Sequence, residues 1–299
     1  MVTPPNLQTG DTVAIVATAR SVQENELSNA KQFLEKIGLK VLVGSSIGPV
    51  DNQFAGSDEI RSKDFQKMLD HPEVKAIWCA KGGYGTVRIL DSLDFSTFLN
   101  NPKWIIGYSD ITALHNHVQG LGVESLHAQI ALGLENKTKE TLASIKKVLF
   151  DEPYSISYAV EEENDNRIGE AEGELIGGNL SVLYSLIGSS SFPKTDGKIL
   201  FIEDLDEYLY HIDRMMQNLK RNGMLKNLKG LIVGGMNDMN DNTIPFGKTA
   251  EEIIREAVSA YDYPVCFNFP AGHIEDNRAL ILGRNVTLAI TEKSMILTF

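Results

Sequence analysis

Short apolar runs alternate with amphipathic stretches along the first half of the chain. Continuous apolar runs are typical of strands buried on both faces, and they predict strands at residues 12–17, 40–43, 74–80 and 103–107. Between these runs, apolar residues recur at helical spacing and predict helices at residues 24–37, 60–69, 87–93 and 111–118. Strands that alternate with helices of this length indicate a parallel sheet covered by helices.

The pattern changes between residues 151 and 174, where acidic residues and isolated glycines break the periodicity. We predict a solvated surface loop there, which is also the natural place for a domain boundary. Beyond it, Gly177-Gly178-Asn179-Leu180 opens a predicted helix. Further strands are predicted at residues 198–202, 230–233 and 265–269, helices at 207–222 and 248–260, and β-structure at 279–299.

Composition narrows the possible partners and location. The 299 residues carry a formal net charge of −12, which disfavours binding to nucleic acids and anionic membranes. No apolar run reaches the length of a membrane span, and Met1-Val2-Thr3-Pro4-Pro5 lacks the features of a signal peptide. Cys79 and Cys266 lie far apart in apolar runs and are predicted to be buried, reduced thiols. No His-Cys cluster has zinc-ligand spacing, so we expect no structural metal. The N-terminus makes export unexpected, and we expect a cytoplasmic protein.

Ser109 lies where a predicted strand turns into a predicted helix. Gly107-Tyr108-Ser109-Asp110 matches the start of Gly-x-Ser-x-Gly, a tight turn that exposes a nucleophilic hydroxyl and directs helix N–H groups at an oxyanion. Ile111 stands at the position of the last glycine, so the match is incomplete. Ser109 or Asp110 could also be the N-cap of the following helix, and the turn alone leaves both interpretations open.

A glycine-rich segment, Lys81-Gly82-Gly83-Tyr84-Gly85, follows the predicted strand at residues 74–80. Arg88 occupies the third glycine position of the dinucleotide-binding pattern, and no Walker sequence is present, so a nucleotide site has weak support. Glycines let a backbone approach a ligand closely. The segment could therefore offer N–H donors to an oxyanion, or it could be a plain tight turn.

Two later strand ends carry groups that could activate a serine. Glu203 and Asp204 follow the strand predicted at residues 198–202, and His273 follows the strand predicted at 265–269. A serine hydrolase needs a base near the hydroxyl and a carboxylate that orients the base. Alternatively, Glu203 or Asp204 stabilises the start of the next helix, and His273 makes a structural hydrogen bond in a loop. Other histidines compete for the role of base, namely His115, His117, His127 and His211.

Together these segments resemble the LD-carboxypeptidase family, serine peptidases that include the murein tetrapeptide carboxypeptidases and the microcin C self-immunity proteins. The resemblance extends from Gly10 to Gly283. The motifs that carry it are Lys81-Gly82-Gly83-Tyr84-Gly85 with Arg88, Gly107-Tyr108-Ser109-Asp110-Ile111-Thr112-Ala113-Leu114-His115, Gly177-Gly178-Asn179-Leu180, Ile202-Glu203-Asp204 with Ile212-Asp213-Arg214, and Phe269-Pro270-Ala271-Gly272-His273.

The resemblance implies the roles of the site residues. Ser109 would be the nucleophile, His273 the general base, and Glu203 the carboxylate that orients His273. The backbone amides of Gly83 and Asp110 would form the oxyanion hole. Neither a cofactor nor a metal is expected.

The resemblance also implies an α/β fold with two domains. A flavodoxin-like domain with a parallel sheet would cover residues 1–160 and carry the nucleophile. A linker would follow at residues 161–173, and a β-rich swivelling α/β domain at residues 174–299 would carry the glutamate and histidine. The triad would be completed across the domain interface, and the protein would be a homodimer.

The implied substrate is murein tetrapeptide, cut between the L-centre of a diamino acid and terminal D-alanine during cytoplasmic recycling of peptidoglycan. A peptidyl-aminoacyl nucleotide is the alternative substrate, and it would require an aromatic side chain to bind the base. Trp78 and Trp104 lie in strand-like runs and are predicted to be core, which favours the murein peptide. A third interpretation is a non-catalytic protein that binds the phosphate of a nucleotide with residues 81–85.

Departures from the family pattern surround the predicted triad and leave the triad itself intact. Lys81 replaces an arginine, which keeps the charge but changes the geometry of its hydrogen bonds. The segments at residues 126–129 and 274–277, and the run between Glu203 and Arg214, also differ from the family. These changes bear on the identity of the substrate more than on the type of reaction.

Overall fold

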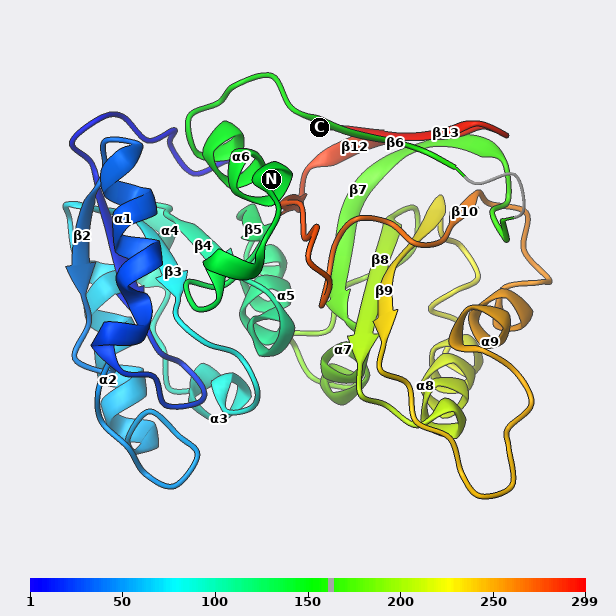
Figure 1. The fold of residues 1–299 in the computed structure, drawn as a ribbon, viewed down its shortest axis with the longest axis horizontal. Helices are drawn as coiled ribbons and strands as arrows, with labels where there is room; N and C mark the ends of the chain where they lie inside the picture. The colour runs from blue at the N-terminus through cyan, green and yellow to red at the C-terminus, as the bar shows by residue number, and fades with distance from the viewer. Residues whose placement is uncertain (161–163) are drawn as a thin grey trace. The chain divides into compact units, whose positions relative to one another are not determined.

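The computed structural model describes residues 1–160 and 164–299, and the chain divides into two compact units (Figure 1). Unit 1 consists of Met1–Pro153 and Glu275–Leu282, and unit 2 of Tyr154–Ile274 and Gly283–Phe299. The chain therefore leaves unit 1, builds most of unit 2, and returns to unit 1 for a short segment. Within unit 1 this segment is fixed by hydrogen bonds from Thr138 Oγ1 to Asp276 Oδ1 (3.0 Å) and from the Ala279 N–H to Ser144 Oγ (2.9 Å).

Unit 1 is built on a sheet with the strand order β11-β5-β4-β3-β1-β2. All neighbouring pairs from β2 to β5 are parallel, and β11 is antiparallel to β5. This is the strand order of flavodoxin-like folds with one added edge strand. The strands are β1 (Thr12–Val16), β2 (Lys40–Val43), β3 (Val74–Cys79), β4 (Trp104–Gly107), β5 (Ser125–His127) and β11 (Leu280–Leu282).

Helices cover both faces of the sheet in unit 1. The crossover β1-α1-β2 and the crossovers that return through β3, β4 and β5 run in opposite directions along the sheet, so right-handed connections place α1 on one face and α2 to α5 on the other. The helices are η1 (Glu24–Leu27), α1 (Ser28–Lys36), α2 (Asp58–Asp70), α3 (Thr86–Leu90), α4 (Ser96–Asn100), η2 (Ser109–Ile111), α5 (Thr112–Gly120), η3 (Leu134–Asn136) and α6 (Lys139–Leu149). The segments after β3 and β4 leave neighbouring parallel strands at the same edge of the sheet.

Unit 2 is built on a sheet with the strand order β10-β9-β8-β7-β12-β13-β6. The pairs from β7 to β10 are parallel, and the pairs among β7, β12, β13 and β6 are antiparallel. The strands are β6 (Ser155–Ala159), β7 (Gly169–Asn179), β8 (Ile199–Leu205), β9 (Gly230–Asn237), β10 (Val265–Cys266), β12 (Asn285–Ile290) and β13 (Ser294–Thr298). The prediction of an α/β chain with an N-terminal parallel sheet and a second, β-rich part is confirmed.

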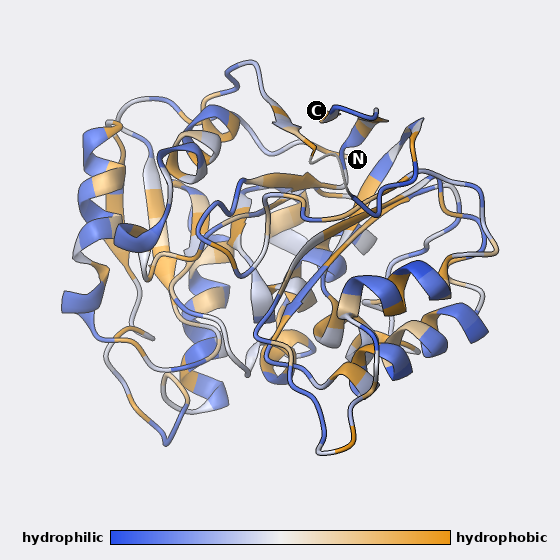
Figure 2. Cartoon of the chain, turned by 45° about the vertical axis from the view of Figure 1, so that its right-hand side comes forward, coloured by the Kyte–Doolittle hydropathy of each residue, from blue (hydrophilic) through white to orange (hydrophobic). Residues whose placement is uncertain are grey.

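Three helices pack their apolar sides on the parallel part of this sheet: α7 (Leu180–Leu186), α8 (Leu209–Arg221) and α9 (Ala250–Ala257). Figure 2 shows hydrophobic residues along strands of both sheets, whereas the helices alternate between hydrophobic and hydrophilic positions. This is the amphipathic pattern from which the helices were predicted. Among the described residues, no helix combines the length and the apolar character needed to cross a membrane.

The predicted surface loop at residues 151–174 is partly wrong. It contains β6 and the first residues of β7, while residues 161–163 of the predicted linker lie outside the described part of the chain. Strand β7 comes very close to β8 at one of its glycines. At Gly177, where φ is +123°, a Cβ atom would lie 1.9 Å from the carbonyl oxygen of Phe201. Strand β5 and helix α6 were not predicted.

Candidate active site

Ser109 occupies a strained turn between β4 and α5. Its φ of 63° lies in the left-handed region, which costs about 1–2 kcal/mol for a residue with a side chain. The buried strand before it and the helix after it hold this conformation. The side chain is half-buried, and the turn begins η2, whose first N–H groups have no partners within the helix.

Two glycines make room for the turn. A Cβ atom at Gly107 would lie 2.8 Å from Cγ1 of Ile111, so the missing side chain of Gly107 leaves the space that Ile111 fills. This accounts for the incomplete Gly-x-Ser-x-Gly match. On the other side, a Cβ atom at Gly82 would lie 3.3 Å from Oγ of Ser109 and 3.7 Å from the backbone N of Asp110. The structure thus places the glycine-rich segment directly against Ser109.

Asp110 connects the serine turn to the glycine-rich segment. Its Oδ2 accepts a hydrogen bond of 2.8 Å from the N–H of Thr86, the first residue of α3. Burial raises the pKa of Asp110, and the hydrogen bonds from Thr86 and Gly85 oppose this shift. Neither Ser109 nor Asp110 caps the helix that follows it, so the N-cap interpretation is wrong.

Arg61 on α2 fixes the far end of the glycine-rich segment. Its guanidinium is fully buried and donates hydrogen bonds to the carbonyls of Thr18 (2.6 Å) and Gly85 (2.9 Å). It also forms an ion pair with Asp58. A buried guanidinium requires such partners. At Gly85, where φ is +144°, a Cβ atom would lie 2.8 Å from Nη1 of Arg61, so only glycine fits.

The histidines of unit 1 that compete for the role of base are held within the fold by burial, hydrogen bonds and ring contacts. His115 is fully buried, with Nδ1 2.9 Å from Ser125 Oγ and Nε2 2.8 Å from the carbonyl oxygen of Gly107. Burial lowers its pKa to about 4. Burial also lowers the pKa of His117, whose ring packs against Phe95. His127 is fully buried beside the rings of Tyr108 and His115.

In unit 2, Glu203 and His273 form a close pair although 70 residues separate them. Oε2 of Glu203 lies 2.6 Å from Nδ1 of His273, and the two side chains are 0% and 13% exposed. Oε1 of Glu203 has no hydrogen-bond partner among the described residues. At this distance the fully buried carboxylate can accept a hydrogen bond from Nδ1–H of the imidazole and so orient the ring.

Two glycines leave the space in which His273 can contact Glu203. At Gly272, where φ is +109°, a Cβ atom would lie 2.8 Å from both Cβ and Oε2 of Glu203. At Gly234 on β9, a Cβ atom would lie 2.4 Å from the carbonyl oxygen of Ala271 and 3.2 Å from Cβ of Glu203. Any larger residue at either position would move the glutamate or the segment that carries the histidine.

Asp204 faces different partners from those of Glu203. Its Oδ1 accepts a hydrogen bond from Asn179 Nδ2 (2.9 Å), and its Oδ2 accepts one from the Ser181 N–H (2.8 Å). Burial, followed by the charge of Glu203, raises the pKa of Asp204 to about 7. Both carboxylates lie within β8, not after it, and neither caps α8, whose N-cap is Tyr208. That alternative role is therefore wrong.

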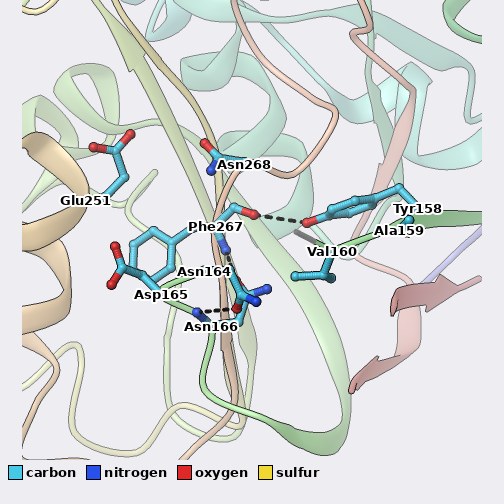
Figure 3. A pocket seen from close by; sticks show the side chains of 9 residues that line it. All are labelled: Tyr158, Ala159, Val160, Asn164, Asp165, Asn166, Glu251, Phe267 and Asn268. Atoms are coloured by element: carbon cyan, nitrogen blue, oxygen red, sulfur yellow. Dashed lines mark hydrogen bonds between the residues drawn. The ribbon is translucent and has the colours of Figure 1, made fainter. Parts of the chain in front are cut away.

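A pocket of about 350 Å³ lies beside the segment that leads to His273 (Figure 3). Tyr158 Oη donates a hydrogen bond to the Phe267 carbonyl (3.0 Å), and the Phe267 N–H donates one to Asn166 Oδ1 (2.8 Å). These bonds fix the start of the segment. His211, the remaining competing histidine, pairs instead with Glu207, which precedes α8, with Nδ1 2.5 Å from Oε2.

The predicted site residues thus form two groups. In unit 1, Ser109 and Asp110 lie against the glycine-rich segment that contains Gly83, and in unit 2 Glu203 contacts His273. The residues that hold these groups, among them Thr86, Asn179 and Arg61, are not predicted from the sequence. Asn179 belongs to a motif that was noticed, but Arg61 lies in a highly charged stretch that resembles a solvated helix face.

Comparison with known proteins relates the whole chain to one family. The model of the LD-carboxypeptidase N-terminal domain matches residues 13–128, and the model of the LD-carboxypeptidase C-terminal domain matches residues 172–288. Ser109 falls in the first match and Glu203 and His273 fall in the second.

Curated relatives and solved structures agree with this match. The chain is 34% identical to the "Probable murein peptide carboxypeptidase" of Bacillus subtilis, over 98% of this chain and 93% of that protein. It is 26% identical to the microcin C7 self-immunity protein of Escherichia coli, over 98% and 94% of the two chains. The crystal structure of muramoyltetrapeptide carboxypeptidase from Oxalobacter formigenes superposes with a TM-score of 0.86 at 27% identity, covering 96% and 97% of the two chains.

Proposed function

Because this chain belongs to the LD-carboxypeptidase family and is a serine-type carboxypeptidase, we propose that it cleaves murein tetrapeptide. The bond cut would be the one between the L-centre of a diamino acid and terminal D-alanine. The observation that carries the proposal is the buried Glu203–His273 pair, 2.6 Å apart, in a chain whose Ser109 sits on a strained turn.

The proposed mechanism is acyl transfer through Ser109. Nε2 of His273 takes the proton of the Ser109 hydroxyl as Oγ attacks the carbonyl carbon, and Glu203 stabilises the imidazolium that forms. The N–H groups of Gly83 and Asp110 donate hydrogen bonds to the oxyanion. His273 then gives its proton to the amine of D-alanine, which leaves, and water hydrolyses the acyl-enzyme.

The first test is the Ser109→Ala variant. We expect kcat for release of D-alanine from tetrapeptide to fall by about 10³-fold or more, because the nucleophile is lost. The matched control is Ser62→Ala, since the Ser62 hydroxyl donates a hydrogen bond to the carbonyl of Glu59 within α2, away from Ser109 in the sequence. Ser109→Ala should also lose labelling by a fluorophosphonate. An unchanged rate in this variant would contradict the proposal.

The alternative substrate is a peptidyl-aminoacyl nucleotide, and its support is the likeness to the microcin C7 self-immunity protein. Trp78 and Trp104 are 0% and 1% exposed, so neither is available to stack on a base. The higher identity to the murein peptide carboxypeptidase also favours tetrapeptide. The same kinetic assay with a peptidyl nucleotide decides between them by the ratio of kcat/KM values.

We place the reaction in the cytoplasm, as part of peptidoglycan recycling. Cys79 and Cys266 are free and fully buried, and burial raises the pKa of both thiols to about 12. Unpaired thiols fit a reducing compartment. A homodimer is the assembly that the family resemblance favours, and light scattering on the purified protein tests it.

A further inference from the structure

Four cations lie on or near the glycine-rich segment, and two of them are neutralised within unit 1. Arg88 binds Asp58 through two contacts, Nε to Oδ1 at 3.0 Å and Nη2 to Oδ2 at 2.6 Å. Arg61 binds the same carboxylate from inside the unit. These two guanidinium groups therefore have structural partners and are not available to a ligand.

Arg20 differs, because no carboxylate among the described residues lies within the 4.0 Å of an ion pair. It is exposed on the segment after β1, and its backbone N–H contacts the carbonyl of Gly82 at 3.5 Å. Its side chain lies along Gly83, where a Cβ atom would be 2.5 Å from Cδ and 2.6 Å from Nε of Arg20. The missing side chain of Gly83 is what lets the arginine lie there.

Lys81 is a second cation without an acidic partner in the described part of the chain. It is half-buried, and its Nζ donates a hydrogen bond of 3.1 Å to the carbonyl of Ser21, the residue after Arg20. Arg20 and Lys81 thus place two positive charges beside the glycine-rich segment without a neutralising carboxylate among the described residues, and such charges attract an anionic ligand.

The position of Arg20 relative to Ser109 suggests which anion this is. Gly82 contacts the Ser109 side chain and Gly83 contacts Arg20, and consecutive Cα atoms are about 3.8 Å apart. In a carboxypeptidase substrate, the terminal carboxylate lies one residue beyond the carbonyl that the nucleophile attacks. The spacing of the two glycines therefore matches the spacing of the reacting carbonyl and the terminal carboxylate.

We infer that Arg20, supported by Lys81, binds the free α-carboxylate of the substrate's terminal residue and so restricts the enzyme to removal of one C-terminal residue. The inference rests on the proposed function. A guanidinium binds a carboxylate through two parallel hydrogen bonds, which a lysine at the same position cannot reproduce. A substrate with a neutral C-terminus could not form this ion pair.

The test compares tetrapeptide with its C-terminal carboxamide. We expect Arg20→Gln to lower kcat/KM for the free acid by about tenfold to a hundredfold, mainly through KM, because a hydrogen-bonded charge pair is lost. The value for the carboxamide should change by less than about twofold, since it carries no charge for Arg20 to bind. Arg20→Lys should lie between wild type and Arg20→Gln for the acid.

Lys36→Gln is the matched control for charge. Lys36 ends α1 and precedes β2, so it lies at the edge of the sheet opposite to the glycine-rich segment, and its loss should change neither rate. If Arg20→Gln lowers the rates on acid and carboxamide equally, the arginine is structural and the inference is wrong. The inference is equally wrong if neither rate changes.

A binding measurement separates this inference from the proposed function. Calorimetry with N-acetyl-D-alanine and its amide measures recognition of the carboxylate without catalysis. If the wild-type protein cleaves neither peptide, the proposed function fails. Arg20-dependent binding of the acid over the amide would then still support the inference, and equal binding of the two by wild type would overturn it.

Discussion

The serine turn of unit 1 and the glutamate strand of unit 2 share one arrangement. In each, the proposed catalytic residue is followed by a buried aspartate whose carboxylate accepts a backbone N–H from the first turn of a neighbouring helix. Asp110 binds the N–H of Thr86, and Asp204 binds that of Ser181. In both cases that helix follows a glycine-rich segment, so one residue performs the proposed chemistry and the next holds the loop beside it.

The two regions differ in how they position the reactive atom. Ser109 is placed by strained backbone, with φ at 63°, whereas Glu203 lies in the regular strand β8. Glu203 obtains its geometry from neighbours that lack side chains, Gly234 and Gly272. Backbone strain thus sets the direction of the nucleophile, and close packing of glycines sets the distance from acid to base.

Among the variants that test this comparison, the largest expected effect comes from removing the charge of Glu203. We expect Glu203→Gln to lower kcat by about 10⁴-fold while the melting temperature stays close to that of wild type, because an amide fixes the wrong tautomer of the base.

The control is Glu207→Gln, since Glu207 also contacts a histidine, His211, at 2.5 Å in the same unit. Its kcat should stay near that of wild type. Similar losses in the two variants would show that the Glu203–His273 pair has no special part in the reaction.

The next largest effect tests the role of glycine packing. In Gly272→Ala, the new methyl group would lie 2.8 Å from Oε2 of Glu203. We expect kcat to fall by about 10²-fold, because a displacement of about 1 Å in a catalytic group has such a cost. Steady-state kinetics measures the loss of kcat, and thermal unfolding measures any loss of stability separately.

Gly188→Ala is the matched control for backbone strain. Gly188 has φ of +90° but open space around its Cβ position, so this variant should lose about 1 kcal/mol of stability and keep its kcat. If both variants keep wild-type kcat, packing against Glu203 does not position it.

The smallest effect concerns the aspartates and pH. With the pKa of Asp204 raised to about 7, the folded chain keeps a proton on this group between about pH 4 and pH 7 that the unfolded chain has released. Stability therefore falls as pH rises through this window, and asparagine removes the dependence. We expect the melting temperature of wild type to fall by a few degrees relative to Asp204→Asn between about pH 5 and pH 8.

Asp206→Asn serves as the control, because Asp206 is exposed just after the same strand. Its melting temperature should follow that of wild type across the range. Asp110→Asn should also lessen the fall in melting temperature between about pH 5 and pH 8, because burial raises the pKa of Asp110 as well. A fall in Asp204→Asn equal to that of wild type would exclude Asp204 as the titrating group.

The sequence predicts the strands and the motifs well because both depend on local patterns. Strands β1, β3 and β4 are predictable because each is a continuous apolar run. Strand β7 was missed because glycine breaks a strand pattern, and the close approach of Gly177 to Phe201 is revealed only by the paired strand. Likewise the buried role of Arg61 depends on the carbonyls of Thr18 and Gly85, and the contact between Glu203 and His273 depends on the fold of unit 2.

The return of residues 275–282 to unit 1 has a consequence for synthesis. Strand β11 closes one edge of the unit 1 sheet, but the ribosome makes it only after nearly all of unit 2. A nascent chain that carries Ser109 and the glycine-rich segment therefore exposes an unpaired β5 edge until the last residues emerge. Because His273 is translated shortly before that strand, a chain interrupted upstream of both would lack the finished sheet and the proposed base.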